Sequence, residues 1–240
     1  MLNQPGKYFV MRIPVKEFVA YARDNYSLAD PILDVCAGWE PNFYQPLFPN
    51  SRYLKQDQIQ FDPPTIDYVC DAHKMEPVND NSIGTVLILE ALEHIQEPQL
   101  VVNEIFRVLK PEGICVATTL MTFEIHRTPY DYWRFCPDGL CFLFRAFDLH
   151  EIVLEHHRTL PRGIWCIAQK REQSIDNNDK MIPASPPKVR VHESGPSHLK
   201  NLIKSLFNKL GIDIIRVSKD ASSAEVVGVR QHDVWKGKLK

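Results

Sequence analysis

The sequence predicts an α/β fold that is doubly wound around a mainly parallel sheet, on the strength of three observations. Short apolar runs of strand length alternate along the chain with segments of helical apolar spacing. Acidic residues directly follow several of those runs, as they do where an open parallel sheet binds a ligand at the carboxyl ends of its strands. The length of 240 residues suits one globular domain with an appendage.

The first half of the chain contributes one helix and four strands. Helical apolar spacing predicts a helix over residues 14–26, with Pro14 at the first position, where its missing N–H does no harm. Three prolines between residues 39 and 50 restrict any helix there to a short or broken one. Apolar runs predict strands at residues 32–36, 52–56, 66–70 and 85–89.

The second half begins with the clearest helix of the chain. Residues 98–109 present a broad apolar face, and the helix ends at Lys110 because Pro111 cannot continue it. The remaining elements are a strand at 114–119, a helix at 137–145 and two closing strands at 149–154 and 163–169. A short connection separates the two closing strands, which favours antiparallel pairing between them.

Composition divides the chain into three parts. Residues 1–170 form the predicted main domain and carry 15 Lys and Arg against 22 Asp and Glu. Residues 171–196 hold almost no large apolar side chain, which predicts a disordered linker. Residues 197–240 begin with an amphipathic helix. This helix could pack on the main domain or a second copy, lie on a membrane surface, or bind a partner; packing is the conservative expectation.

Cysteine spacing and hydropathy exclude several classes of protein. The six cysteines show neither zinc-ligand spacing nor a disulfide framework, so we expect free thiols and no metal. No apolar run has the length of a signal-peptide core or a membrane span. We therefore expect a cytoplasmic protein, with peripheral membrane or protein contact through residues 197–211 as an alternative.

Four acidic residues stand at the ends of predicted strands and outline a nucleoside pocket. Asp57 follows Asp34 by 23 residues, a spacing at which an acid can bind a ribose diol. Asp71, followed by Ala72, could accept a hydrogen bond from an adenine amine, with an Asx turn as the alternative. Glu90 closes the fourth run.

The turn after the first strand limits the choice of cofactor. Gly38 is its only glycine, whereas the pyrophosphate of a dinucleotide needs several glycines for close backbone approach. Glu40 adds a negative charge that would repel the phosphates. The neighbouring prolines interrupt the helix whose N-terminus would meet them. The turn thus argues against NAD(P) and favours a nucleoside without phosphates, such as S-adenosylmethionine.

Four segments together resemble a known family. They read Ile32-Leu33-Asp34-Val35-Cys36-Ala37-Gly38, Asp71-Ala72-His73, Leu89-Glu90-Ala91-Leu92-Glu93-His94-Ile95 and Glu104-Ile105-Phe106-Arg107-Val108-Leu109-Lys110-Pro111-Glu112-Gly113. The chain resembles the class I S-adenosylmethionine-dependent methyltransferases, above all the type 11 branch with its L-E-H and R-V-L-K-P-G-G signatures. The resemblance implies a Rossmann-like, doubly wound sheet of seven strands, of which the last is antiparallel.

The resemblance also implies a role for each residue of the cofactor pocket. The methionine end would lie against Asp34, Cys36, Ala37 and Gly38, the ribose against Asp57, the adenine against Asp71 and Ala72, and the cofactor's flank against Leu89 and Glu90. Cys36 and Glu40 replace the first and third glycines of the family's turn.

A second constellation, residues 126–135, follows the fifth predicted strand, where similar methyltransferases line their acceptor pocket. A hydroxyl acceptor needs a base, which His126, Asp131 or His94 could supply. The candidates for binding the acceptor are Arg127, Tyr132, Trp133 and Arg134. The alternative is a structural lid, in which Arg134 pairs with an acid and His94 is simply packed.

The residues and the resemblance together predict methyl transfer from S-adenosylmethionine to a small-molecule or glycan-linked acceptor, at a hydroxyl oxygen. The glycan suggestion comes from similar proteins of polysaccharide pathways. The alternative is a degenerate scaffold that binds the cofactor and recruits a partner through its C-terminal helix. A nucleic-acid acceptor is not expected, because residues 1–170 are acidic and no N/D-P-P-Y/F motif follows the fourth strand.

Overall fold

The structure is a computed structural model that describes residues 5–38, 42–127, 129–171 and 187–192. Its helices are α1 (Pro5–Asn25), α2 (Pro98–Val108) and α3 (Pro137–Leu143), with the short 3-10 helices η1 (Gln45–Leu47) and η2 (Leu92–His94). Its strands are β1 (Ile32–Val35), β2 (Tyr53–Asp57), β3 (Tyr68–Val69), β4 (Ile83–Leu89), β5 (Leu109–Leu120), β6 (Phe147–Glu155), β7 (Gly163–Lys170) and β8 (Lys188–His192).

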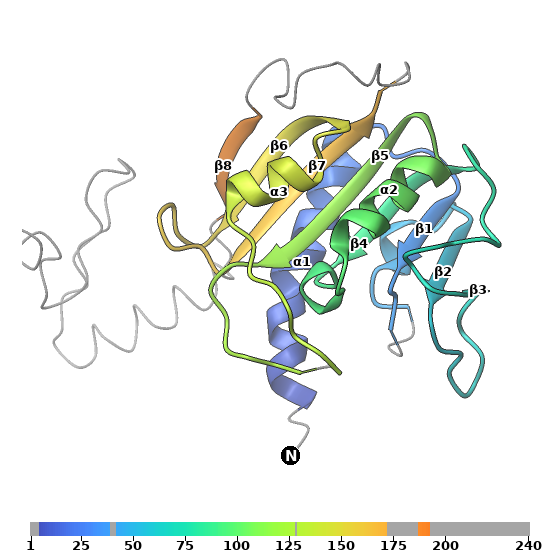
Figure 1. Cartoon of the computed structure of the whole chain (residues 1–240), viewed down its shortest axis with the longest axis horizontal. Helices are drawn as coiled ribbons and strands as arrows, with labels where there is room; N and C mark the ends of the chain where they lie inside the picture. The colour runs from blue at the N-terminus through green and yellow to red at the C-terminus, as the bar shows by residue number, and fades with distance from the viewer. Residues whose placement is uncertain (1–4, 39–41, 128, 172–186, 193–240) are drawn as a thin grey trace, which may run out of the picture. The chain divides into compact units, whose positions relative to one another are not determined.

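These strands form one sheet in the order β3-β2-β1-β4-β5-β7-β6-β8 (Figure 1). In the parallel part, Ile32 of β1 lies opposite Tyr53 of β2 and Thr85 of β4. β7 runs antiparallel to both of its neighbours, β5 and β6. The predicted Rossmann-like fold is therefore confirmed, and β8 adds an eighth strand that pairs parallel with β6.

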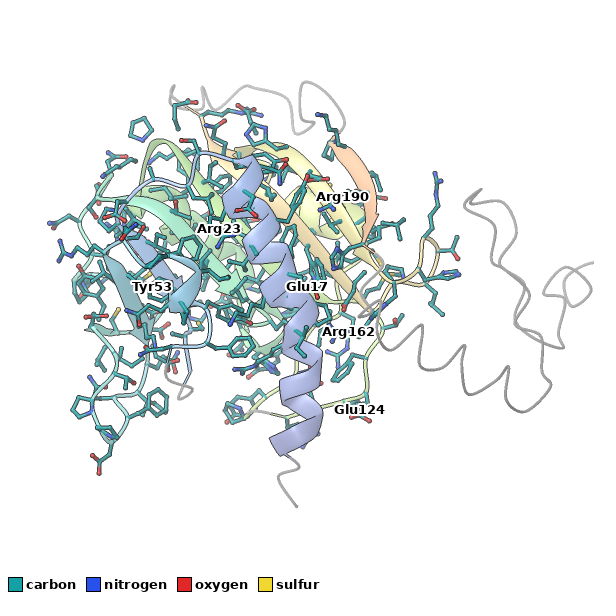
Figure 2. All side chains as sticks on the ribbon, turned by 180° about the vertical axis from the view of Figure 1, so that it is seen from behind. Glu17, Arg23, Tyr53, Glu124, Arg162 and Arg190 are labelled. Atoms are coloured by element: carbon teal, nitrogen blue, oxygen red, sulfur yellow. The ribbon has the colours of Figure 1, made fainter. Side chains whose placement is uncertain are left out.

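Helices cover both faces of the sheet, as the opposite views in Figures 1 and 2 show: α2 and α3 lie on one face and α1 on the other. Each face of the sheet has its own hydrophobic core. Consecutive residues of β4 lie in different cores, since Val86 packs beneath α2 and Leu87 beneath α1. On the α1 side, the ring centroids of Phe18 and Trp165 lie 5.0 Å apart. A strand buried on both faces must be apolar throughout, which explains the unbroken apolar run that predicted β4.

The structure corrects two element predictions and confirms a third, that of a short helix at most between residues 39 and 50. α1 begins at Pro5, so Pro14 lies inside the helix and not at its first position. Between β1 and β4 the described connections contain only η1, because the prolines of that stretch prevent a longer helix. Part of the expected linker 171–196 is strand β8, whose Val189 and Val191 alternate with Arg190 along the free edge of β6.

The described residues all belong to one compact unit, which spans residues 1–194. The predicted C-terminal helix and the rest of the expected linker lie outside the described residues. All six cysteines are free, and two of them, Cys115 and Cys166, are buried in the sheet. Within the part of the chain that the structure describes, no helix combines the length and the apolar character that a membrane span requires.

Candidate functional site

The candidate site lies at the edge of the sheet where the parallel strands end. Three residues just past β1 and β4 have left-handed backbone conformations: Cys36 with φ 56°, Gly38 with φ 70° and Glu90 with φ 50°. Only glycine adopts this conformation freely, so the two other residues carry strain of about 1–2 kcal/mol each. Such strain is typical of a turn whose shape is required for binding.

The turn after β1 is tied to the end of β2. The backbone N–H of Cys36 donates to the side-chain oxygen of Gln56 at 3.1 Å, and that of Gly38 donates to Asp57 Oδ2 at 3.0 Å. Among the described residues, a Cβ atom at Gly38 would meet no atom within 4 Å beyond its chain neighbours. A cofactor can therefore approach the backbone closely.

Asp57 is half-buried, and both of its carboxylate oxygens accept backbone hydrogen bonds. Oδ1 accepts from Ile59 N at 3.3 Å, opposite the bond from Gly38 to Oδ2. These two bonds fix the plane of the carboxylate and still leave lone pairs for two hydroxyl protons. The geometry fits the predicted ribose diol.

Asp34 lies one strand away, buried on the α1 side of the sheet. The Tyr53 hydroxyl donates to its carboxylate at 2.8 Å, and Figure 2 labels Tyr53 on that face. Burial raises the pKa of Asp34 to about 6, against the lowering effect of Tyr53 and of the nearby Lys55 and Arg12. Asp34 and Ala37 line a common narrow cavity with residues 42–45, in keeping with the predicted methionine end.

Asp71 and Ala72, the predicted adenine-binding pair, follow β3. Asp71 Oδ1 accepts from the backbone N–H of His73 at 2.8 Å and lies 2.7 Å from its Nδ1. This is the Asx turn considered as the alternative, and its hydrogen bonds to His73 outweigh burial and lower the pKa of Asp71. Ala72 is buried in the core beneath the turn, while the Asp71 side chain is about half exposed.

Glu90 belongs to an ion network that the sequence analysis missed. Its carboxylate lies 3.6 Å from Arg162, which in turn lies 2.7 Å from the fully buried Glu155. Burial raises the pKa of Glu90 to about 8, although Arg162 opposes that shift. The available sequence signal was that Glu155 ends β6 as the other acids end their strands, and that Arg162 directly precedes β7 at the same edge (Figure 2).

A second polar cluster forms where η2 meets the loop after β5. Glu93 is fully buried and its Oε2 accepts from the Thr119 hydroxyl at 2.9 Å, whereas its Oε1 has no hydrogen-bond partner in the part of the chain that the structure describes. The rings of His94 and His126 lie edge to face with centroids 4.7 Å apart. One ligand atom from each of Glu93, His94 and His126 lies within 4.8 Å of the other two.

The protonation of this cluster follows from its surroundings. Burial raises the pKa of Glu93 to about 7. Burial, and then the neighbouring His94, lower the pKa of His126. His94 Nδ1 lies against the Tyr130 carbonyl oxygen, which can only accept, so a proton on Nδ1 is held in this hydrogen bond.

Asp131 and Arg134 hold the loop of residues 121–136 in place. The Asp131 side chain is only 2% exposed, accepts two hydrogen bonds from the Arg134 guanidinium, and accepts a third from the backbone of His126 at 2.8 Å. Arg134 chiefly, and the His126 backbone with it, hold the pKa of Asp131 well below its ordinary value. The predicted lid role of Arg134 is thus observed, and Asp131 is its partner.

The same loop docks on η2 through its backbone. The N–H groups of Tyr132 and Trp133 donate to the Glu93 carbonyl at 2.8 and 3.2 Å, and the Trp133 indole donates to the Ile95 carbonyl at 2.9 Å. The aromatic side chains of Tyr132 and Trp133 remain 44% exposed. Arg127 is also exposed. The loop therefore offers two flat aromatic surfaces and a cation next to the His94–His126 pair.

Comparison with known proteins agrees with this geometry. Residues 47–117 match the family described as a methyltransferase domain, type 11. No curated protein matches the chain. A methyltransferase of Methanosarcina mazei is 16% identical with a TM-score of 0.51, covering 64% of this chain and 98% of that chain. A methyltransferase of Archaeoglobus fulgidus is 14% identical with a TM-score of 0.51, covering 68% and 99%.

The fold also carries other chemistry. The cyclase SpnF is 16% identical with a TM-score of 0.51, covering 65% of this chain and 80% of that chain. At such identities the solved structures establish the fold, and the family match over η1 to β5 confirms the resemblance found in the sequence signatures. The acceptor must be inferred from the residues of the site.

Proposed function

We propose that this chain is a class I S-adenosylmethionine-dependent methyltransferase of the type 11 branch, and that it methylates a hydroxyl oxygen of a small or glycan-linked acceptor bound between η2 and the loop 121–136. One observation carries the proposal: two imidazoles and a buried carboxylate converge just past β4, beside the strand ends that suit the cofactor. A hydroxyl is a poor nucleophile while it holds its proton, so it needs such a cluster.

The residues at the strand ends fit the cofactor. S-adenosylmethionine supplies a methyl group on a sulfonium sulphur. Asp57 presents a carboxylate fixed by two backbone N–H groups for the ribose, and the space beside Gly38 admits a ligand. Asp34 adds a buried carboxylate and Glu90 a partly buried one, and a cationic ligand stabilises the charge of both. These roles for Asp34, Asp57 and Glu90 follow the sequence prediction.

The loop 121–136 supplies the acceptor's binding surface. Tyr132 and Trp133 expose flat rings on which a sugar or aromatic ring can stack, and Arg127 can pair with an anionic group. Arg134 is committed to Asp131, so it positions the loop and does not bind the acceptor. In-line methyl transfer depends mainly on orientation, which makes a rigid loop the principal catalytic device.

The Glu93–His94–His126 cluster activates the hydroxyl. His94 Nδ1 is engaged by the Tyr130 carbonyl oxygen, so Nε2 is the nitrogen that remains to accept the hydroxyl proton. The buried Glu93 lies beneath the pair, bonded to Thr119. Asp131 acts behind His126 by holding its backbone and facing its Nδ1 at 3.5 Å. We therefore assign Asp131 a positioning role in place of the base role that the sequence suggested.

The test separates binding from turnover. Calorimetric titration with S-adenosylhomocysteine measures the cofactor site, and an acceptor screen with sugars and phenols measures methyl transfer. His126→Ala should lower kcat/KM by about 100-fold or more and leave the affinity for S-adenosylhomocysteine within twofold. His150→Gln, toward the other end of β6, is the matched control.

The two measurements also decide between the enzyme and the scaffold. Binding of S-adenosylhomocysteine without turnover of any acceptor would favour the cofactor-binding scaffold, whose partner contact would involve residues 197–211. Methylation at nitrogen, unaffected by His126→Ala, would reject the hydroxyl acceptor and leave the family assignment intact.

A further inference from the structure

The Glu93–His94–His126 cluster has the composition of an open metal site. Two imidazoles and one carboxylate are a ligand set that proteins use for divalent transition metals, with further positions left for water or substrate. The three ligand atoms lie within 4.8 Å of one another. Ligand pairs in a tetrahedral zinc site lie about 3.4 Å apart, so modest side-chain rotations would close the set around an ion.

Each ligand also has the outer partner that metal ligands characteristically have. The Tyr130 carbonyl faces Nδ1 of His94. Nδ1 of His126 faces the Glu124 carbonyl at 3.3 Å and the Asp131 carboxylate at 3.5 Å. Both imidazoles can therefore donate through Nδ1 and ligate through Nε2, with a carboxylate behind one of them.

Glu93 gives an independent indication that a ligand is expected here. Its Oε2 is held by the Thr119 hydroxyl at 2.9 Å, yet Oε1 has no hydrogen-bond partner among the described residues although Glu93 is fully buried. A buried carboxylate oxygen without a partner is destabilising unless a ligand satisfies it. The charge of Arg134 acts on this carboxylate, but Arg134 is already paired with Asp131.

We propose that Glu93, His94 and His126 bind one divalent transition-metal cation of the zinc class at the acceptor side of the site. Nitrogen ligands favour such a cation over Mg²⁺ or Ca²⁺, which prefer oxygen. The binding claim is independent of the methyl acceptor, whereas its catalytic consequence rests on the proposed function. The sequence predicted no metal, because that expectation considered cysteine spacing and because His126 lies 32 residues beyond the adjacent Glu93 and His94.

In the metal-loaded protein the cation takes over activation of the acceptor. It lowers the pKa of a coordinated hydroxyl, and the proton leaves to solvent. The electron pair of the O–H bond stays on oxygen and forms the new bond to the methyl carbon. The carbon–sulphur bond breaks with its pair on sulphur, giving a methyl ether and a neutral thioether. The metal is neither oxidised nor reduced.

The experiment uses the full chain without a histidine tag, freed of metal with a chelator. Calorimetric titration with Zn²⁺ should show one site of micromolar affinity or better. Glu93→Gln and His126→Ala should each weaken it at least 10-fold, while His150→Gln should not. Circular dichroism checks that each variant is folded. Full affinity in both folded variants would overturn the proposal.

Co²⁺ provides a readout that needs no variant. Bound at this site it should give visible ligand-field absorption without the sulphur-to-cobalt charge-transfer band that cysteine ligands produce. A thiolate band, or no stoichiometric uptake, would overturn the site. Metal binding without methyl transfer would keep this inference and reject the proposed function. Methyl transfer that resists chelators, by a protein that takes up no metal, would reject the metal site and keep the proposed function.

Discussion

At the residue scale, the candidate site is built from carboxylates in unfavourable surroundings. Burial raises the pKa of Asp34 to about 6, of Glu90 to about 8 and of Glu93 to about 7. Clustered perturbed acids at one edge of a sheet are typical of a functional site. A cationic ligand at this edge would favour their charged forms. We therefore expect these carboxylates to strengthen ligand binding and to lower the folding stability of the ligand-free protein.

Asp34 offers a direct test of this loss of folding stability. Its folded-state pKa lies above that of an unfolded aspartate, so wild-type stability falls as the pH rises from about 4 to about 6. Asp34→Asn removes this loss. At pH 7.5 it should raise the free energy of unfolding by about 1–3 kcal/mol, the upper limit following from 1.36 kcal/mol per pKa unit. Urea unfolding at pH 5 and 7.5 measures the difference.

The matched variant for this test is Tyr53→Phe, which removes the hydroxyl bonded to Asp34 and leaves the carboxylate. It should destabilise the protein at pH 7.5, because Asp34 loses its hydrogen bond. A stability gain from Asp34→Asn that is equally large at pH 5 and 7.5 would mean that the carboxylate is not the cause.

Asp57 is expected to bind the cofactor's ribose. Asp57→Ala should weaken S-adenosylhomocysteine binding by about 10–100-fold, because one charge-assisted hydrogen-bonding group contributes about 1.5–3 kcal/mol. Calorimetry measures the change. Asp148→Ala removes an exposed carboxylate that pairs with Arg171 at the start of β6, and it should leave the affinity unchanged. Equal effects of the two substitutions would count against a ribose contact.

At the element scale, the loop 121–136 depends on one ion pair. Asp131 and Arg134 bond through both carboxylate oxygens, and Arg134 also donates to the carbonyls of Glu124 and Trp133. The backbone of the loop bonds to η2. Positioning of His126 over His94 is therefore a property of the whole loop.

Asp131→Asn and Arg134→Gln should consequently act as one change. Each should lower kcat/KM at least 10-fold, and the double variant should be little worse than either, with a coupling energy of about 1–3 kcal/mol. A double-mutant cycle in kcat/KM measures it, with S-adenosylhomocysteine affinity as the control. If the two effects on kcat/KM were fully additive and Arg134→Gln left kcat/KM unchanged, Asp131 would again be the candidate for the base.

β8 is the element that the sequence did not predict, and its attachment to β6 can be tested. Arg190 lies 2.7 Å from the buried Glu151 and 3.8 Å from the centre of the Tyr21 ring. Arg190→Ala leaves that carboxylate without its cation, so the free energy of unfolding should fall by about 2–4 kcal/mol. Lys188→Ala on the same strand, exposed, should change it by less than about 0.5 kcal/mol. Thermal unfolding distinguishes the two.

At the scale of the whole molecule, the sheet collects at one edge residues that are distant in sequence. The turn after β1, Asp57, Glu90 and the loop after β5 meet because parallel strands bring their carboxyl ends to one edge. β7 runs the other way, so its beginning, with Arg162, reaches the same edge. The topology thus explains why an arginine between two strands faces an acid at the end of β4.

The sequence by itself determined the strands of the core, the helices α2 and α3 and the acids that end the strands. Apolar periodicity, prolines and polar strand ends are local signals, and they place β4 and Asp57 without any knowledge of packing. The family signatures added the antiparallel seventh strand, which the topology confirms.

Only the tertiary structure decided which side chains meet. Glu93 and His126 are 33 residues apart in the chain, and Glu90 and Arg162 are 72 apart, yet each pair shares one site. Asp131 turned from a predicted base into the partner of Arg134, and residues 188–192 joined a sheet edge. The physical reason is that local periodicity fixes which face a residue takes, whereas pairing and pKa depend on long-range packing and burial.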